Sequence, residues 1–361
     1  MTIAIVSVIL ALAGSTMAAS TNVVAVGFIA VTNGSGSMQI TAFGLDGKVQ
    51  RRLTTGPANH HYPSLSPDGE DLLYTGDEGG YDEIYRLNLA RPGAGAQITR
   101  PPLMANSASW SPDGRSIVYS ALVPGAGAYE VFVANSDGTN PVQLTHTTDS
   151  GNAQPAFSPD GARIVYINGR ETSGPGPNSS TVSGVANRIW VMAADGSGAA
   201  PLTAGPLDAY PAWLDAKTVI FARSAFLSEG SQVVSVNIAG REQVQSPLHQ
   251  YFVEPKPQPD GRSYGATMET GPELHLVKVS RHDGAALGAP GTSDFIIDRL
   301  GIPAAEGSSF TMAWILAQAP QGPPARPVPY PIFGVAGSAI LLLVLGAAAS
   351  FRKLRRKTNA C

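Results

Sequence analysis

Ser66-Pro67-Asp68-Gly69 is the stretch of sequence that decides the fold, because it returns along the chain at nearly even spacing. The same four residues stand at 111–114 and 158–161, which places the copies 45 and 47 residues apart. Proline fixes φ at the first turn position, aspartate bonds back to nearby amides, and glycine accepts the left-handed conformation that closes a hairpin. The motif therefore predicts hairpin turns, in which the repeated aspartates have a structural role.

Two weaker copies extend the series toward the C-terminus. Gln258-Pro259-Asp260-Gly261 keeps the proline, the aspartate and the glycine. Residues 210–216, Tyr-Pro-Ala-Trp-Leu-Asp-Ala, repeat the flank that Tyr62-Pro63-Ser64-Leu65 forms before the first turn, but the turn that follows is shorter. The chain therefore holds five copies of one unit.

Short apolar segments flank each turn and predict four strands in every unit. One strand precedes the turn and a second follows it, as in Ile117-Val118-Tyr119, where β-branched and aromatic residues favour a strand. A third alternates apolar residues with others, for example at 83–87 and 130–133. The fourth is short and ends in Leu-Thr, as at Leu144-Thr145. Acidic residues open the third strand, and we expect them to satisfy the strand start instead of binding a cation: Glu83, Glu130 and Glu273.

Four antiparallel strands in about every 45 residues are the sequence signature of a propeller blade. Residues 23–54 supply three strands of a blade with no first strand ahead of them, whereas residues 310–317 form a strand-like run with no partner after it. Pairing the two ends closes the ring and leaves no open sheet edge. The predicted fold is all-β, a six-bladed β-propeller of four-stranded antiparallel blades, with seven blades as the alternative.

Composition agrees with a turn-rich globular chain, since 43% of residues are hydrophobic, 14% are charged, and there are 40 glycines and 29 prolines. The stretch beyond residue 318 contains six basic residues and no acidic residue, so the rest of the chain has a net charge of −9. A body this acidic is not expected to bind nucleic acid, which attracts Lys and Arg. The lone Cys361 excludes an intrachain disulfide.

The N-terminal residues 1–19 are predicted to be a signal peptide. An apolar run at 3–14 is too short to span a bilayer and is followed by small residues suited to a signal peptidase. No Lys or Arg precedes this run, so an uncleaved first strand or anchor stays the alternative.

The C-terminal residues are predicted to form a membrane anchor after the propeller at 20–317. The proline-rich stretch 318–331 favours an extended stalk, and 332–351 carries no charge over the length of a transmembrane helix. The basic tail 352–361 is expected on the cytoplasmic side. These features predict a single-pass protein of the cell membrane whose propeller faces the periplasm or cell surface. The same order of segments resembles PEP-CTERM sorting signals, which leaves open whether the anchor is processed.

The Ser-Pro-Asp-Gly turns, the aromatic third strand and the closing Leu-Thr resemble the WD40-like PD40 repeats of TolB-type propellers, over about residues 22–317. The resemblance implies a non-catalytic binding role in the cell envelope. TolB itself has a separate N-terminal α/β domain and no membrane span, so these differences argue against a true Tol-Pal role. The resemblance is specific for architecture and weak for activity, because propellers host unrelated functions.

Catalytic signals are scarce in the sequence. No Gly-x-Ser-x-Gly nucleophile elbow exists, although related propellers occur attached to serine peptidases. Other TolB-like propellers resemble lyases that hold a divalent metal through several histidines, and the weak candidates for such a site are His60, His61 and His249. No cofactor is expected otherwise, and whether the protein is an enzyme stays open, with a binding module favoured.

Residues at the start of each first strand are the best candidates for a ligand site. Aligned on the turn motif, they are expected to ring the mouth of the central channel, where the loops between blades meet. The candidates are His60, His61, Tyr62, Asn106, Ser107, Asn152, Gln154, Asp208, Tyr210 and Glu254. The predicted function is binding of a protein, peptide or envelope polymer at this mouth. The alternative is a metal-dependent lyase or hydrolase acting on a saccharide in the funnel.

Overall fold

The computed structural model describes residues 25–316, apart from 33–35, 92–93, 101–102, 125–126, 176–180, 206, 225–230, 247–250, 271–272, 289–293 and 301–311. The predicted signal peptide, stalk, transmembrane helix and basic tail all lie outside the described residues. Within the described ranges, no helix has the length and apolar character needed to cross a membrane.

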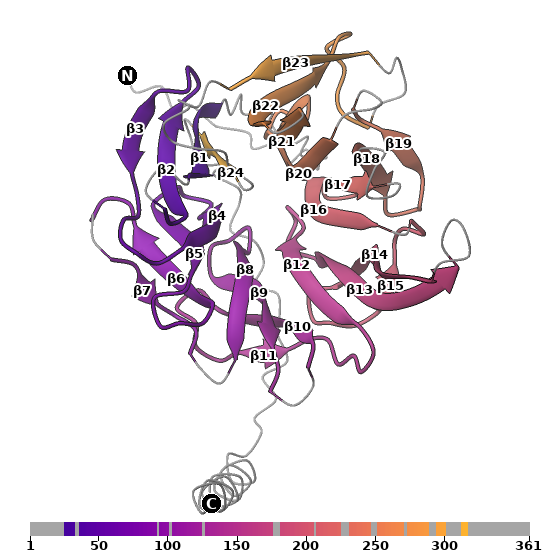
Figure 1. The fold of residues 1–361 in the computed structure, drawn as a ribbon, viewed down its shortest axis with the longest axis horizontal. Helices are drawn as coiled ribbons and strands as arrows, with labels where there is room; N and C mark the ends of the chain where they lie inside the picture. The colour runs from indigo at the N-terminus through magenta and orange to yellow at the C-terminus, as the bar shows by residue number, and fades with distance from the viewer. Residues whose placement is uncertain are drawn as a thin grey trace, which may run out of the picture. The chain divides into compact units, whose positions relative to one another are not determined.

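The strands of this part of the chain form six four-stranded antiparallel sheets. The sheets are arranged as blades around a common axis, as Figure 1 shows. The first blade contains β24 (Met312–Leu316), β1 (Ala25–Thr32), β2 (Gln39–Gly44) and β3 (Val49–Arg52). The second contains β4 (His60–Leu65), β5 (Asp71–Gly76), β6 (Glu83–Asn88) and β7 (Ala96–Gln97), and the third β8 (Met104–Trp110), β9 (Ser116–Leu122), β10 (Tyr129–Asn135) and β11 (Val142–Gln143).

The remaining blades follow the same order of strands. The fourth contains β12 (Gly151–Phe157), β13 (Arg163–Pro175), β14 (Thr181–Ala193) and β15 (Ala200–Pro201). The fifth contains β16 (Asp208–Asp215), β17 (Thr218–Ser224), β18 (Ser231–Asn237) and β19 (Glu242–Val244). The sixth contains β20 (Tyr251–Pro257), β21 (Ser263–Thr270), β22 (Glu273–Arg281) and β23 (Phe295–Arg299).

The two ends of the propeller meet in the first blade. Strand β24 pairs antiparallel with β1, so that Trp314 lies opposite Phe28 and Met312 opposite Ala30. Both edges of β1 are thereby hydrogen-bonded, one to β24 and the other to β2. The predictions of six blades and of closure by the last strand are confirmed.

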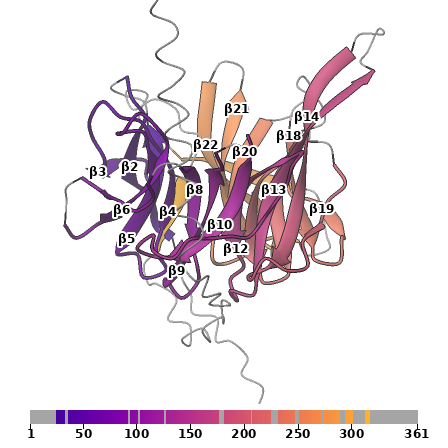
Figure 2. The same ribbon diagram turned by 90° about the horizontal axis from the view of Figure 1, so that it is seen from below.

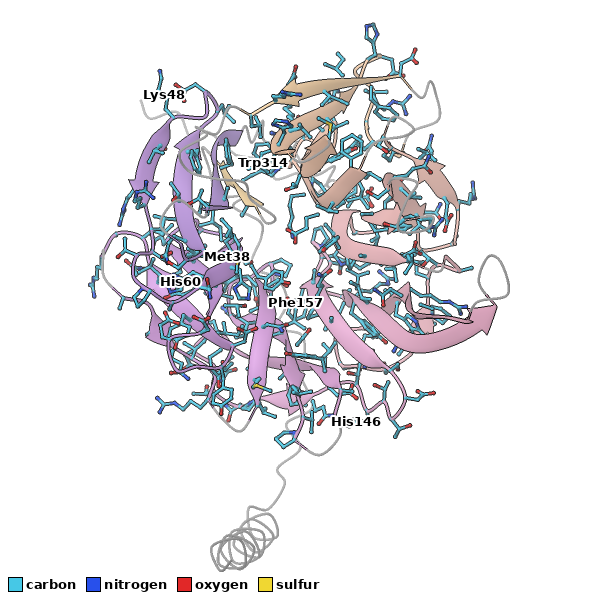
Figure 3. The ribbon with its side chains drawn as sticks, viewed as in Figure 1. Met38, Lys48, His60, His146, Phe157 and Trp314 are labelled. Carbon is cyan, nitrogen blue, oxygen red and sulfur yellow. The ribbon has the colours of Figure 1, made fainter. Side chains whose placement is uncertain are left out.

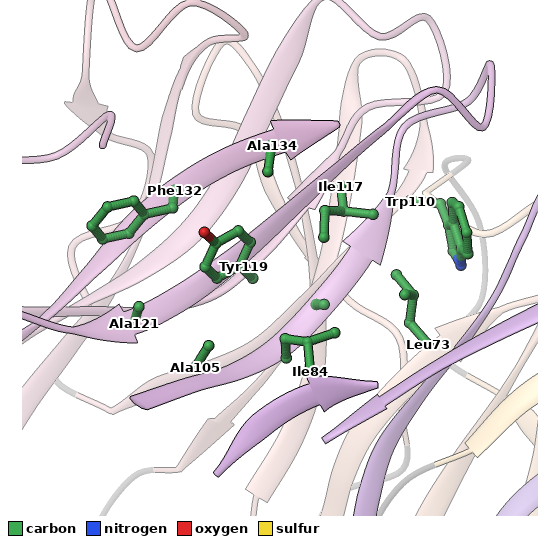
Figure 4. Close-up of a cluster of buried hydrophobic side chains, with 10 residues drawn as sticks. Leu73, Ile84, Ala105, Trp110, Ile117, Tyr119, Ala121, Phe132 and Ala134 are labelled. Carbon is green, nitrogen blue, oxygen red and sulfur yellow. The ribbon is translucent and has the colours of Figure 1, made fainter. Parts of the chain in front are cut away.

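Hydrophobic packing between neighbouring blades makes the core. In the cluster of Figure 4, Leu73 and Ile84 of the second blade pack against Ile117 and Tyr119 of the third, and all four side chains are at most 2% exposed. Burial of such apolar faces between sheets is the main force that holds the ring together. The core therefore runs around the ring and leaves the central axis to other side chains.

The Ser-Pro-Asp-Gly motif forms the turn that its chemistry predicts. The Ser66 hydroxyl accepts a hydrogen bond from the Asp71 amide at 2.9 Å and donates one to the Asp68 carboxylate. That carboxylate also accepts from the Glu70 amide, and these bonds lower the pKa of Asp68, with the Ser66 hydroxyl as the main cause. Gly69 closes the turn at a φ of +73°. The aspartates of the motif serve the turn.

The closing Leu-Thr pair lies after the fourth strand and not at its end as predicted. Strands β7, β11 and β15 have two residues each and stop before it. The Thr99 hydroxyl accepts from the Ile84 amide of β6 at 2.8 Å and donates to the buried Glu83 carboxylate at 2.6 Å. A side-chain hydroxyl thus replaces a ladder hydrogen bond, which explains both the short strand and the recurring acid.

The β13–β14 hairpin extends beyond the pairing of β13 with its other neighbour, β12. Strand β12 pairs with β13 only as far as Gly151 opposite Gly169, whereas β13 and β14 continue from Arg170 opposite Ala186 to Pro175 opposite Thr181. The extra length forms a two-stranded ribbon that projects past the start of β12 (Figure 2).

Candidate binding site in the central channel

The first strands of blades two to six share one irregularity. Each register shifts after its second or third residue, for example between His61 and Ser64 in β4 and between Asn106 and Ser109 in β8. One residue of each bulge adopts a left-handed conformation, with φ between 51° and 57°: Tyr62, Ser107, Gln154, Tyr210 and Glu254. Such a conformation costs an L-residue about 1 kcal/mol or more, so its fivefold recurrence marks a built feature.

The bulges hold their residues through bonds to the neighbouring blade. The amide of Ser107 donates to the Thr75 hydroxyl of the second blade at 3.2 Å. The amide of Tyr210 donates to the Gln154 side-chain oxygen of the fourth blade at 3.0 Å. A β-bulge re-aims the side chain that it carries, and these contacts fix the new direction.

The five bulged side chains line one cavity of about 690 Å³, which also extends to strands β2 and β3 of the first blade and to the turn at Ser66–Gly69 of the second. Two residues further along four of the bulged strands, the wall is made by Ser64, Ser109, Ala156 and Lys256, and Ala313 of β24 also lines the cavity. Figure 3 shows Phe157 and Trp314 toward the middle of the ring and His146 at its outer edge. The small side chains leave the room that the cavity occupies.

Electrostatics in the cavity centre on Glu254. Its side chain is 4% exposed, and its Oε2 atom has no hydrogen-bond partner. Burial raises the pKa of this carboxyl to about 8, against a smaller lowering effect of Lys256. Burial, followed by the Glu254 charge, raises the pKa of Tyr62 to about 12 and also raises that of Tyr210. At neutral pH all three groups are mainly uncharged.

Three of the predicted site residues lie inside the blades and away from the cavity wall. His60 is buried, with Nδ1 2.9 Å from the Gln39 oxygen and Nε2 2.9 Å from the Glu78 carboxylate. Asn152 is buried and donates to Glu130. Asp208 is fully buried and forms a bidentate ion pair with Arg223. The structure therefore does not bring these side chains to the residues that line the cavity.

His61 and Asn106 immediately precede bulged residues but do not line the cavity. The Nε2 atom of His61 lies 3.8 Å from the Asp82 carboxylate, and its Nδ1 atom is buried without a partner. His249 lies outside the described residues. Among the residues that the structure describes, no group of three or more His, Cys, Asp or Glu side chains could hold a metal ion.

Lys256 was not among the predicted site residues, although it lines the cavity. Its signal in the sequence is indirect. When the repeats are aligned, the other first strands have Ser or Ala at the position where this strand has Lys256. The structure places residues 254 and 256 on the same cavity wall, although the bulge between them interrupts the alternation of the strand.

The repeat sequence matches the PD40 family, described as "TolB beta propeller domain", over residues 8–175. The propeller is TolB-like. The chain is 29% identical over 140 residues to a "Protein TolB homolog" of Chlorobium luteolum, covering 39% of this chain and 31% of the relative. It is 32% identical over 109 residues to the "Tol-Pal system protein TolB" of Anaeromyxobacter dehalogenans, covering 30% of this chain and 21% of the relative. The matched regions thus span less than a third of these relatives.

Solved TolB structures share the fold of this TolB-like propeller. TolB from Acinetobacter baumannii superimposes with a TM-score of 0.59 at 17% identity, covering 80% of this chain and 65% of that one. A putative TolB from Agrobacterium tumefaciens gives 0.53 at 18% identity, covering 80% and 98%. A chain of a nidogen/laminin complex gives 0.56 at 14% identity, covering 81% of this chain and 99% of that one. At these identities the likeness concerns the fold alone.

Proposed function

We propose that this protein is a non-catalytic, membrane-tethered binding propeller that engages a protein, peptide or envelope polymer at the mouth of its central channel. The observation that carries the proposal is the cavity of about 690 Å³, into which five blades each direct one bulged residue. Ligand pockets are concave, largely preformed and about this large, roughly 300 to 1,000 Å³. Backbone strain repeated at one level of the ring is a further mark of a functional site.

The chemistry of the wall suits binding. Two tyrosines offer rigid rings with a polar tip, which favours them in recognition surfaces. Ser107 and Gln154 add hydroxyl and amide groups, and Glu254 is the buried acid. Names of relatives such as "Tol-Pal system protein TolB" place related propellers in an envelope system, which supports a partner outside the cytoplasm. The apolar segment 332–351 and the basic tail support the membrane tether.

Site-specific cross-linking tests the proposal in the full-length protein. A photoreactive phenylalanine analogue is placed at Tyr62 or Tyr210, and, as the matched control, at Tyr81, which is 59% exposed. We expect one discrete cross-linked product from the two channel positions in intact cells and none of that size from position 81. Without cross-linking, replacing Tyr62 and Tyr210 together by Ala is expected to abolish co-purification of the partner found in that product, whereas Tyr81→Ala retains it. Equal products from all three positions would contradict a channel site.

A further inference from the structure

Among the described residues of the cavity wall, Glu254 has a buried carboxyl oxygen, Oε2, that lacks a hydrogen-bond partner. The residue is 4% exposed. Leaving such a group unpaired in a low-dielectric site is unfavourable, and natural structures rarely do so without a functional reason. The bulge at φ 55° places this residue on the channel wall, so its carboxyl lies beside the space that a ligand would enter.

The surroundings of Glu254 decide what kind of ligand would supply the missing partner. Tyr62 of β4 and Tyr210 of β16 line the same cavity and sense the charge of Glu254. Their rings offer apolar walls and π-faces that attract a cation. Lys256, on the same strand, lowers the pKa of Glu254 by charge attraction but makes no hydrogen bond to its Oε2 atom. One acid between two phenol rings fits a single organic cation.

A divalent metal fits this place less well. Metal sites for hard cations draw on several oxygen ligands, commonly more than one carboxylate. Glu254 is the one acid among the bulged residues, and no group of three possible His, Cys, Asp or Glu ligands exists among the described residues. A primary ammonium needs fewer partners, because one carboxylate and nearby neutral oxygens satisfy its three donors.

We propose that the channel is a subsite for a primary alkylammonium group, which binds the carboxylate of Glu254 between Tyr62 and Tyr210. This deepens the function proposed above and rests on it, because the ammonium belongs to the ligand that enters the channel. The occupant is a lysine side chain or the amino terminus of a peptide partner. A free polyamine carries the same group and is distinguished by the test.

Binding of an ammonium group is expected to release one proton from the Glu254 carboxyl. Burial raises the pKa of Glu254 to about 8, so the carboxyl is mainly protonated at pH 7. An ammonium that arrives with its own proton favours the carboxylate, and the carboxyl proton leaves to the solvent. The facing phenols do not take it up, since burial and the Glu254 charge raise the pKa of Tyr62 to about 12 and also raise that of Tyr210, so both already hold their protons.

Small probes test the subsite in the full-length protein held in nanodiscs. n-Pentylammonium chloride is titrated at pH 7 beside 1-pentanol, its neutral counterpart of the same length, and binding is followed by ligand-observed NMR. We expect the amine to bind at least tenfold more tightly than the alcohol. Calorimetry in two buffers of different ionisation enthalpy is expected to show release of close to one proton per amine bound.

Variants give changes of opposite sign. Glu254→Gln keeps the shape of the side chain and is expected to weaken amine binding at least tenfold, while Lys256→Met removes a competing cation and is expected to strengthen it severalfold. Glu70→Gln, at an exposed turn position, is the matched control and leaves binding unchanged. Equal binding of amine and alcohol, or an unchanged affinity in Glu254→Gln, would overturn the ammonium subsite.

Two further comparisons separate the sources of the ammonium and the two proposals. Trilysine binding more tightly than spermidine at equal charge supports a peptide ligand, whereas the reverse overturns the peptide assignment. If amines do not bind but the Tyr62 and Tyr210 cross-links persist, the channel still binds a partner and only the ammonium subsite fails. If amines bind and the cross-links are absent, the proposed macromolecular partner fails instead.

Discussion

The indole nitrogen of Trp314 lies 2.9 Å from the backbone carbonyl oxygen of Lys256 and donates a hydrogen bond to it. Trp314 lies in β24, which is the last strand in sequence and belongs to the first blade, whereas Lys256 lies in the sixth blade. The same bond joins Trp110 to Ser64 and Trp213 to Ala156, each at 3.0 Å. Three tryptophans thus fasten alternate pairs of neighbouring blades around the cavity, and one of them lies at the seam where the ring closes.

The tryptophan at the seam is predicted to contribute strongly to stability. Trp314→Ala is expected to lower the free energy of unfolding by about 4 kcal/mol, because it removes a large buried side chain. Trp314→Phe keeps most of that packing and is expected to cost about 1 kcal/mol for the lost hydrogen bond. Urea denaturation followed by circular dichroism measures both.

Trp190 provides the control for the hydrogen bond. Its indole nitrogen is buried and has no partner, so Trp190→Phe removes an unsatisfied donor and is expected to cost less than Trp314→Phe. Equal losses in the two phenylalanine variants would show that the bond to Lys256 contributes nothing.

Gly138 and Gly240 provide a matched pair for contacts between blades. Both adopt a left-handed φ, +81° and +80°, and both donate a turn hydrogen bond of 2.8 Å. A Cβ atom on Gly240 meets open space, whereas one on Gly138 would overlap the carbonyl oxygen of Ile98 in the neighbouring blade. Gly240→Ala is expected to cost about 1 kcal/mol for the conformation alone, and Gly138→Ala at least about 2 kcal/mol more for the overlap. Chemical denaturation of both variants checks the difference.

Glu254 is predicted to make stability fall as pH rises. Burial raises its pKa in the folded state to about 8 from an ordinary value of 4.5, so between these values the folded chain holds a proton that the unfolded chain has lost. The contribution of Glu254 to the free energy of unfolding is therefore least unfavourable below about pH 4.5, and it becomes more unfavourable as the pH rises to about 8. Relative to the wild type, Glu254→Gln is expected to gain stability over this window, by up to about 3 kcal/mol at pH 7. Denaturation curves at a series of pH values measure the difference, and a constant difference would contradict the prediction.

The Thr145 hydroxyl is predicted to hold the start of a third strand. It accepts from the Val131 amide at 2.8 Å and donates to the buried Glu130 carboxylate. Thr145→Val leaves the Val131 amide without a partner and removes one of the hydrogen bonds to Glu130, which keeps those from Asn152 and Thr147, and is expected to cost about 2 kcal/mol. Thr148→Val, at an exposed position in the following loop, is the control and is expected to change stability by less than about 0.5 kcal/mol. Thermal and urea unfolding of the two variants provide the comparison.

Much of the fold could be predicted from the sequence because the repeat unit is governed by local chemistry. Ser66, Asp68 and Gly69 form their turn through bonds within a few residues, so the motif is legible without any tertiary contact. The closing strand could be placed because 310–317 lacked partners and the first blade lacked a strand. The fourth strands were misplaced because the hydroxyl of Thr99 substitutes for a backbone bond, which a strand pattern does not reveal.

The candidate site could be predicted only in part. Aligning the repeats selects Tyr62 and Tyr210, and the structure places both on the cavity wall; their role in binding stays a prediction. The residues two positions earlier, such as His60 and Asp208, face the blade interior because the side-chain direction changes at the bulge. Neither the left-handed φ of Glu254 nor the missing partner of its carboxyl has a signature in composition or spacing.

The pairing of β24 with β1 also determines when the first blade can be completed during translation. Strand β3 ends at residue 52 and β24 begins only at residue 312, so nearly the whole propeller leaves the ribosome before its first blade can be completed. During that interval β1 presents an unpaired edge, the kind of surface that recruits other chains into aggregates. We expect a nascent chain stalled before residue 312 to bind holdase chaperones along β1, and release to coincide with the emergence of the last strand.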